Sequence, residues 1–173
     1  MTDNMAQSAA DGLELVPDEA QDVGPSGEVE RAVAFYLGGQ RYALPLERVN
    51  EIQQIVAFSE VPEDSSAVVG MINMRGNVIP AVDMRRLVGL EAEPYTLETP
   101  MIIIQTQGQT VALIVDSVED VLELPVGCLQ DAPPLHALAS KMIGVCRMPD
   151  GLMNLLDIDL LLSVDMLVGE DSA

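Results

Sequence analysis

Two aspartates, Asp83 and Asp157, are by type and position the residues most able to do chemistry in this sequence. Each follows an apolar run, at the same place in one of two repeated segments. A pair of carboxylates can act as general acid and general base, which would suit a small acid hydrolase. An aspartate at a strand end can instead accept hydrogen bonds from the first backbone N–H groups of a helix. We favour helix capping and keep the hydrolase as a competing interpretation.

Residue types that bind metals or phosphates are isolated in the chain. His136 is the only histidine, and no ligand set or triad surrounds it. Lys141 is the only lysine, and no glycine-rich phosphate loop precedes it. Cys128 and Cys146 lack Cys-x-x-Cys spacing, so we expect two free, half-buried thiols. The sequence therefore predicts no catalytic residue, no metal and no cofactor.

The charge balance restricts the partners of the chain. Its 173 residues carry a formal net charge of -20, with only eight lysines and arginines. Binding to nucleic acid phosphates or to anionic lipid headgroups depends on basic clusters, and none is present. The first residues lack the pattern of a signal peptide, and no apolar run approaches the roughly 20 residues that span a bilayer. We expect a cytoplasmic protein that does not bind nucleic acid or insert into a membrane.

The chain divides into an acidic tail and a repeated domain. Residues 1–30 contain eight acidic residues and no basic ones, and they have too few apolar side chains to offset the entropy of ordering, which predicts disorder. In residues 31–168, Gly39–Ile52 aligns without gaps on Gly108–Val121. A second pair of segments also aligns: Gly70–Val88 on Gly144–Leu162. Two copies of about 70 residues suit two similar small β-barrels packed together.

Apolar periodicity predicts strands in this domain and a helix at its end. Residues 31–38 alternate between two faces, which is typical of a half-buried strand. Residues 158–168 are too apolar for a free tail and are predicted to form a helix over one barrel end. Asp116 and Asp120 are expected at strand ends in solvent.

Arg75 is the side chain that we single out for binding. Two short apolar strands meet at Arg75, Gly76 and Asn77, where Gly-Asn is a hairpin signal because both residues tolerate positive φ. The planar guanidinium can pair through two hydrogen bonds with a carboxylate, either Glu51 of this chain or one on a partner. The two roles are compatible. With no catalytic motif in the chain, such a surface predicts a protein that works by binding other proteins.

Three ordered motifs resemble those of the CheW family. Residues 70–85 fit its signature Gly-Val-x-Asn-Leu-Arg-Gly-x-x-x-Pro-x-x-Asp-Leu-Arg. Residues 35–52 resemble its opening hairpin, and residues 111–118 its second Val-Asp-x-Val element. The resemblance implies a mainly β fold of two five-stranded SH3-like barrels that share one core. It also implies a non-catalytic adaptor that couples chemoreceptors to a CheA-type histidine kinase. The alternative is an adaptor of a parallel pathway, such as twitching motility or surface sensing.

The resemblance also implies two contact surfaces. A chemoreceptor cytoplasmic tip would dock in the groove between the barrels, near Val49, Glu51, Gly70, Arg75, Val118 and Val121. Three of these, Val49, Val118 and Val121, could instead pack in the core, and for Gly70 we favour a role in backbone geometry or close packing over direct contact. The kinase regulatory domain would contact Leu129, Gln130 and Leu135, where family members often carry a basic and an aromatic residue. This chain has Gln130 and Leu135 there, which either argues against ring-type assemblies or implies a kinase partner with a differently tuned contact surface.

Overall fold

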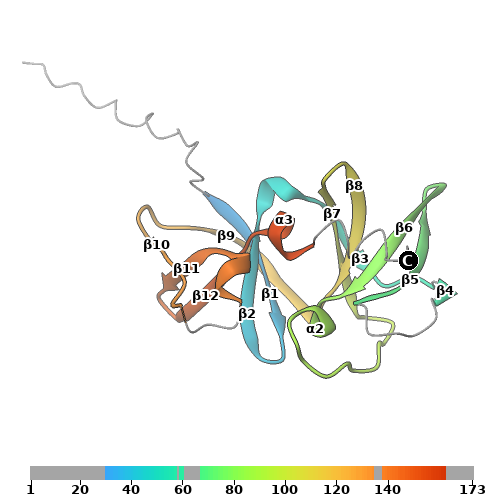
Figure 1. Cartoon of the computed structure of the whole chain (residues 1–173), viewed down its shortest axis with the longest axis horizontal. Helices are drawn as coiled ribbons and strands as arrows, with labels where there is room; N and C mark the ends of the chain where they lie inside the picture. The colour runs from blue at the N-terminus through green and yellow to red at the C-terminus, as the bar shows by residue number, and fades with distance from the viewer. Residues whose placement is uncertain (1–29, 58, 61–66, 135–137, 163–173) are drawn as a thin grey trace, which may run out of the picture. The chain divides into compact units, whose positions relative to one another are not determined.

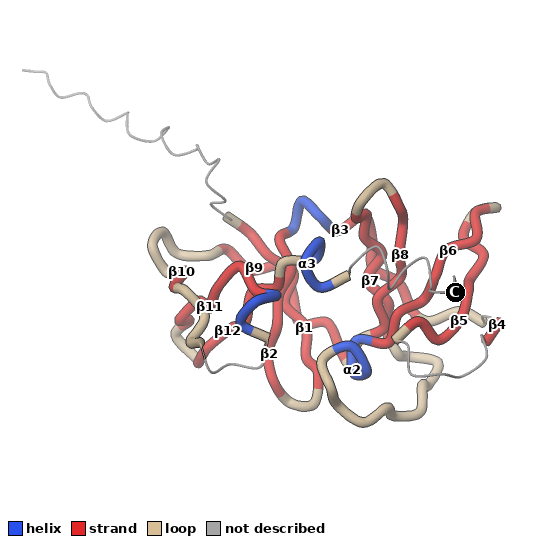
Figure 2. The backbone as a smooth tube through the Cα atoms, in the orientation of Figure 1, coloured by secondary structure: helices blue, strands red, loops and turns tan. Residues whose placement is uncertain are grey.

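The computed structural model describes residues 30–57, 59–60, 67–134 and 138–162 (Figure 1). The described residues from Arg31 onward belong to one compact unit. Residues 1–29 of the predicted disordered tail and the chain after Leu162 lie outside the described residues. Strands predominate in the described chain, and the helical segments are single turns (Figure 2).

The described strands form two sheets, with the orders β10-β11-β12-β2-β1-β9 and β3-β7-β8-β6-β5-β4. Their bounds are β1 Arg31–Leu37, β2 Gln40–Pro45, β3 Val49–Gln54, β4 Ser59–Glu60, β5 Val68–Met74, β6 Asn77–Asp83, β7 Pro100–Thr106, β8 Gln109–Ile114, β9 Ser117–Glu123, β10 Leu129–Gln130, β11 Met142–Met148 and β12 Gly151–Leu156. The helical turns are η2 Leu46–Arg48, α2 Met84–Leu87, η3 Ala139–Lys141 and α3 Ile158–Leu161. Each sheet thus has five strands of six or seven residues and one strand of two residues at an edge.

The two sheets do not coincide with the two sequence repeats. The β1–β2 hairpin belongs to the first repeat, but β2 pairs in parallel with β12 of the second repeat. The β7–β8 hairpin of the second repeat likewise pairs through β8 with β6 of the first. The repeats have therefore exchanged their first hairpins. Each sheet is built from strands of both halves, an arrangement that the repeat pattern did not predict.

Ion pairs of reversed polarity join the exchanged parts. In one, Nε of Arg85 on α2 lies 2.7 Å from Oδ1 of Asp116, just after β8. In the other, Nη2 of Arg48 in η2 lies 2.7 Å from Oδ1 of Asp159 on α3. Arg85 and Asp159 are equivalent positions of the two repeats.

Apolar side chains of β7 alternate between two clusters. Ile102 and Ile104 join a cluster shared by both sheets and by α2 and α3. Met101 and Ile103 point the other way, into a cluster formed within the second sheet. Because successive side chains of a strand point to opposite faces, a continuous apolar run indicates burial on both faces. The shared cluster is the common core that the family resemblance implied.

Strand β1 corrects the prediction of a half-buried strand. Val33 and Phe35 enter the shared cluster. On the opposite face, Ala32 and Ala34 are also fully buried. They are the repeat equivalents of Met101 and Ile103, which lie inside the second sheet. Alternation of large and small apolar residues was therefore mistaken for alternation of buried and exposed ones.

The hairpin between β5 and β6 turns one residue earlier than predicted. Arg75 and Gly76 occupy the turn with φ values of 51° and 88°, and Asn77 already begins β6. Positive φ at both central residues is typical of the type I′ turn, whose twist matches that of the flanking strands. The side-chain oxygen of Asn73 accepts a hydrogen bond from the Gly76 N–H, 3.0 Å away. An asparagine side chain thus stabilises a turn that places an arginine at its tip.

Both aspartates first considered for catalysis cap short helices, as predicted. Oδ1 of Asp83 accepts from the Arg85 N–H at 2.9 Å, at the start of α2. Oδ1 of Asp157 accepts from the N–H groups of Asp159 and Leu160 at the start of α3. Ile158 and Leu161 of α3 are buried, but the structure describes α3 only to Leu161 within the longer helix that was predicted.

The two cysteines are bonded to each other, which corrects the prediction of free thiols. The Cα atoms of Cys128 and Cys146 are 5.0 Å apart, within the range that a disulfide requires. Leu129 lies opposite Cys146 in the β10–β11 register, so its neighbour Cys128 reaches the same strand. Their separation of 18 residues gave no sign of this proximity.

Candidate functional site

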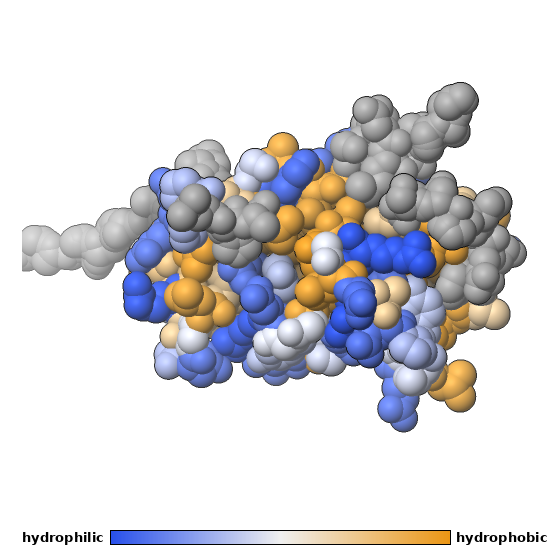
Figure 3. Space-filling model, turned by 60° about the horizontal axis from the view of Figure 1, so that its bottom comes forward, coloured by the Kyte–Doolittle hydropathy of each residue, from blue (hydrophilic) through white to orange (hydrophobic). Residues whose placement is uncertain are grey.

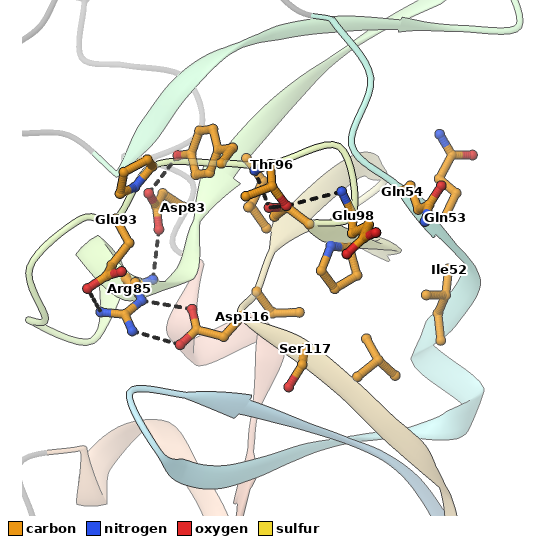
Figure 4. A pocket seen from close by; sticks show the side chains of 17 residues that line it. Ile52, Gln53, Gln54, Asp83, Arg85, Glu93, Thr96, Glu98, Asp116 and Ser117 are labelled. Atoms are coloured by element: carbon orange, nitrogen blue, oxygen red, sulfur yellow. Dashed lines mark hydrogen bonds and ion pairs between the residues drawn. The ribbon is translucent and has the colours of Figure 1, made fainter.

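A hollow of about 820 Å³ opens between β3 and the start of β9 (Figure 4). Each of these strands pairs with a single neighbour, β3 with β7 and β9 with β1. Ile52 of β3 and Val118 of β9 supply apolar surface, and Ile52 is 41% exposed. The segment from Glu93 to Pro100 lines the rest of the wall. We call this hollow the β3–β9 groove.

Arg85 and Asp116 fix one side of the β3–β9 groove. Nε and Nη2 of Arg85 donate to Oδ1 and Oδ2 of Asp116 at 2.7 and 2.8 Å. The Gly38 N–H also donates to Oδ2, at 2.8 Å. Burial alone would raise the pKa of Asp116, but the hydrogen bonds and charge of Arg85 outweigh it and lower the pKa. Asp116 lies between β8 and β9 and is exposed, as expected, although its side chain, 30% exposed, is held by Arg85.

Asp83 and Tyr95 form a second polar contact on this wall (Figure 4). Asp83 is 2% exposed, and its Oδ2 accepts a hydrogen bond from the Tyr95 hydroxyl at 2.6 Å. Its other oxygen caps α2 through the Arg85 N–H. A buried carboxylate requires such partners to offset its lost hydration. The contact ties the segment after α2 to the end of β6.

The chemistry of the β3–β9 groove suits recognition rather than reaction. Four carboxylates and one guanidinium line it, namely Asp83, Glu93, Glu98, Asp116 and Arg85. The two buried or half-buried carboxylates already accept hydrogen bonds from protein donors. No cluster of three or more potential metal ligands occurs within the described residues. The groove therefore presents apolar side chains with an excess of negative charge.

A family model of the CheW-like domain matches residues 31–166. This chain belongs to the CheW-like domain family. The chemotaxis protein CheW of Helicobacter pylori is 25% identical over 139 residues, which cover 80% of this chain and 84% of that protein. CheW of Bacillus subtilis is 32% identical over 104 residues, 60% of this chain and 67% of that one. Protein PilI of Pseudomonas aeruginosa is 26% identical over 112 residues, 64% of this chain and 63% of that one.

The fold agrees with that of a solved family member. The crystal structure of the scaffolding protein TtCheW from Thermoanaerobacter tengcongensis superposes with a TM-score of 0.72 at 25% identity, covering 80% of this chain and 91% of that one. The predicted mainly β fold of two SH3-like barrels is therefore confirmed. Membership of the CheW-like domain family makes this chain a chemotaxis coupling adaptor. Among its described residues, none of the helices could cross a bilayer.

Glu51 and Arg75 are the pair that the structure brings together most directly among the residues implied for receptor binding. Nη1 and Nη2 of Arg75 donate to the two carboxylate oxygens of Glu51 at 2.6 and 2.9 Å. This two-point contact lowers the pKa of Glu51. It also links β3 to the β5–β6 hairpin across the second sheet. The Arg75 side chain is 71% exposed, so it stays accessible to a partner.

The other four implied receptor residues have different environments. Val118 lines the β3–β9 groove, although it also packs against the shared core. Val49 packs against the same core, and Val121 is 43% exposed on β9. Gly70 is buried in β5, opposite Ala81 of β6. This burial is consistent with a role of Gly70 in backbone geometry or close packing.

The implied kinase residues lie at an edge of the first sheet. Leu129 and Gln130 are the whole of β10, which pairs only with β11. Leu129 is partly buried and Gln130 is exposed. Leu135 lies outside the described residues.

Ile52 and Tyr95 are the site residues that the sequence did not reveal. Ile52 ends the Val-x-Glu-Ile element. Interpretation of this element as a strand of alternating burial would have placed Ile52 and Glu51 on opposite faces of the strand. Tyr95 carries no such signal, because its contact with Asp83 depends on the path of the segment between α2 and β7.

Proposed function

We propose that this chain couples a chemoreceptor to a CheA-type histidine kinase without catalysis of its own. The observation that carries the proposal is the β3–β9 groove, on a chain whose relatives are named as chemotaxis and scaffolding proteins. The cytoplasmic tip of the receptor occupies the groove, and the kinase regulatory domain contacts the first sheet at β10. Coupling then arises because one rigid core holds both surfaces.

Helix recognition explains how the β3–β9 groove works. A helix that lies in such a groove gains affinity from apolar contacts, here with Ile52 and Val118, and orientation from a few charges. Water weakens exposed ion pairs, whereas apolar contacts are favoured because they remove apolar surface from water. The apolar residues therefore supply most of the affinity. Arg75 and Glu51 lie outside the groove lining, and we assign them a second contact with the receptor that sets its orientation, because they present both charges at one edge of the second sheet.

Charge reversal at Arg75 tests the receptor surface. Arg75→Glu places a second carboxylate beside Glu51, but the pair is exposed, so the circular dichroism spectrum stays that of the wild type. We expect at least a tenfold loss of binding to a receptor signalling tip from the same organism, measured by co-sedimentation. Arg86→Glu is the matched control, since it reverses an exposed arginine that is not among the residues implied for receptor binding. Wild-type binding by Arg75→Glu would exclude Arg75 from the receptor site, and unfolding would assign it a structural role.

An apolar-to-charged change tests the groove itself. Ile52→Glu adds a negative charge to an already negative groove and removes apolar contact, so receptor binding should fall at least tenfold. Leu152→Glu on β12 is the matched control, because Leu152 is 57% exposed and lies outside the groove lining. Equal loss in both variants would refute docking in the β3–β9 groove. Absence of both receptor and kinase binding in the wild type, at tens of micromolar, would refute the adaptor proposal.

The pathway is a separate question from the coupling function. Similarity to PilI of Pseudomonas aeruginosa and FrzA of Myxococcus xanthus, at 26% identity each, extends beyond relatives named CheW. A parallel pathway such as twitching motility or surface sensing is therefore the second candidate. Deletion of the gene should abolish directed swimming if chemotaxis is the pathway, and surface motility if the alternative holds.

A further inference from the structure

The disulfide holds a very short strand at the edge of the first sheet. β10 consists of two residues and pairs with β11 through Leu129 opposite Cys146 and Gln130 opposite Val145. Two residue pairs stabilise the pairing of β10 with β11 only weakly, because a stable two-stranded contact needs more length and apolar cover. The bond from Cys128 to Cys146 fixes the residue just before β10 to the middle of β11.

A glycine makes the close approach of β10 possible. A side-chain carbon on Gly144 would collide with the backbone oxygen of Gln130, and it would lie 3.1 Å from a methyl group of Leu129. β11 is therefore shaped to receive β10 at this point. Gly144 leaves room for β10, and the disulfide links the residue before β10 covalently to β11. Of these two features, only the disulfide can be broken and reformed by a redox reaction.

The two sulfurs of the bond differ in access. Cys146 is fully buried, and its Sγ lies 3.6 Å from the Sδ of Met148. Cys128 is partly exposed, after a turn in which its N–H donates to the Pro125 oxygen at 3.1 Å. Exchange with a dissolved thiol requires access to a sulfur, so it begins at Cys128. Cys128 is therefore the more accessible residue of the pair, and Cys146 is sheltered in the sheet.

We propose that Cys128 and Cys146 form a reversible redox site that controls how firmly β10 is held on β11. The co-reactant is a small thiol–disulfide couple such as glutathione. The Cys128 thiolate attacks glutathione disulfide and releases one glutathione. The Cys146 thiolate then attacks the mixed disulfide at Cys128 and releases the second. The cysteine pair thereby transfers two electrons and two protons to glutathione disulfide, which becomes two molecules of reduced glutathione. Reduction of the bond is the reverse reaction.

The consequence for signalling rests on the proposed function. An adaptor beside a histidine kinase works in a compartment where thiols are kept reduced, and disulfides there are mostly transient or redox-sensing. Leu129 and Gln130 are the residues proposed to contact the kinase, and they are the whole of β10. Formation of the disulfide therefore holds β10 on β11 and completes the kinase surface. Reduction of the disulfide releases β10 from β11.

The first experiment measures the bond and the strand without any partner. The full chain is equilibrated anaerobically at a series of glutathione to glutathione disulfide ratios, then alkylated and weighed by mass spectrometry. We expect conversion between dithiol and disulfide within the series. Hydrogen exchange in residues 126–130 should be at least tenfold faster in the dithiol form, with residues 70–74 of β5 unchanged as an internal control. A pair that stays in one state throughout, or equal exchange in the two forms, would overturn the proposal.

Variants separate the bond from its consequences. Cys128→Ala with Cys146→Ala should show the fast exchange in every buffer. Gly144→Ala should show it with the disulfide intact, because it displaces β10 directly; if this variant fails to fold, the wild-type comparison still decides. The dithiol form should bind a CheA-type regulatory domain at least tenfold more weakly than the disulfide form. Equal binding would refute control of the kinase contact, whereas no binding by either form would refute the proposed function and leave the redox site standing.

Discussion

Replacement of Asp116 by asparagine tests the contact that joins the exchanged halves. The carboxylate accepts three hydrogen bonds, two from Arg85 and one from the Gly38 N–H. Asparagine keeps one oxygen, but its NH₂ group faces a donor where the second oxygen was. Hydrogen bonds to charged groups contribute roughly 1.5–3 kcal/mol, and exposed ion pairs about 0.2–1 kcal/mol.

The side chains of this pair are 30% and 17% exposed, between these two cases. After allowance for solvent screening we expect Asp116→Asn to lower the free energy of unfolding by about 1.5 kcal/mol. For a domain of this size, that corresponds to a fall of about 6 °C in the melting temperature. Urea denaturation followed by circular dichroism measures the first quantity, and calorimetry the second.

The pH dependence gives a second, independent measurement. The pKa of Asp116 is lowered in the folded chain from the ordinary value of 3.8. Its contribution is therefore fully present above about pH 5 and is lost as the pH falls through the folded pKa. The difference in stability between wild type and variant should shrink between roughly pH 5 and pH 3.

A matched control and a refuting result complete the test. Asp120→Asn changes an exposed carboxylate on β9 that accepts only from the adjacent Val121 N–H within the described contacts, so it should leave stability nearly unchanged. A loss below about 0.5 kcal/mol for Asp116→Asn, or a difference between wild type and variant that does not change with pH, would refute the assigned role of the ion pair.

Three further predictions concern single contacts. Tyr95→Phe removes the hydrogen bond to the buried Asp83 carboxylate and should lower the free energy of unfolding by about 1.5 kcal/mol, and an unchanged urea midpoint would contradict this. Asp157→Ala removes the cap of α3 and should cost about 1 kcal/mol by the same assay, whereas a loss well below that would show that α3 is held by packing alone. Of the two partners of Arg41, Glu119 makes two hydrogen bonds and is less exposed than Asp150. Glu119→Gln should therefore reduce the melting temperature more than Asp150→Asn, and the reverse order would contradict the geometry.

Much of the fold could be predicted because short sequence motifs of neighbouring residues indicate its hairpins and caps. The signature in residues 70–85 predicted a hairpin, an arginine at its tip and a capping aspartate, and all three are present. The pairing of Arg75 with Glu51 was one of two stated alternatives. The turn was misplaced by one residue, because Gly76 fits either turn position and the Asn73 side chain decides between them.

The groove was only partly predictable. Glu51, Arg75 and Val118 were placed by resemblance, and Val118 does line the groove. Gly70 was placed near it too, with backbone geometry or close packing as the favoured role, and it is buried within β5. A motif records which residues recur, and it does not distinguish a side chain that contacts a partner from a glycine that lets two strands pair.

The sequence by itself determined the hairpins, the aspartate caps and the twofold repeat, because each depends on residues close together in the chain. Only the tertiary structure decided that the repeats exchange their first hairpins, that Arg85 faces Asp116, and that Cys128 meets Cys146. These contacts join residues that are at least 18 positions apart in the chain. Equivalent strands of the two repeats are similar enough to pair either way, so packing across the whole domain selects one arrangement.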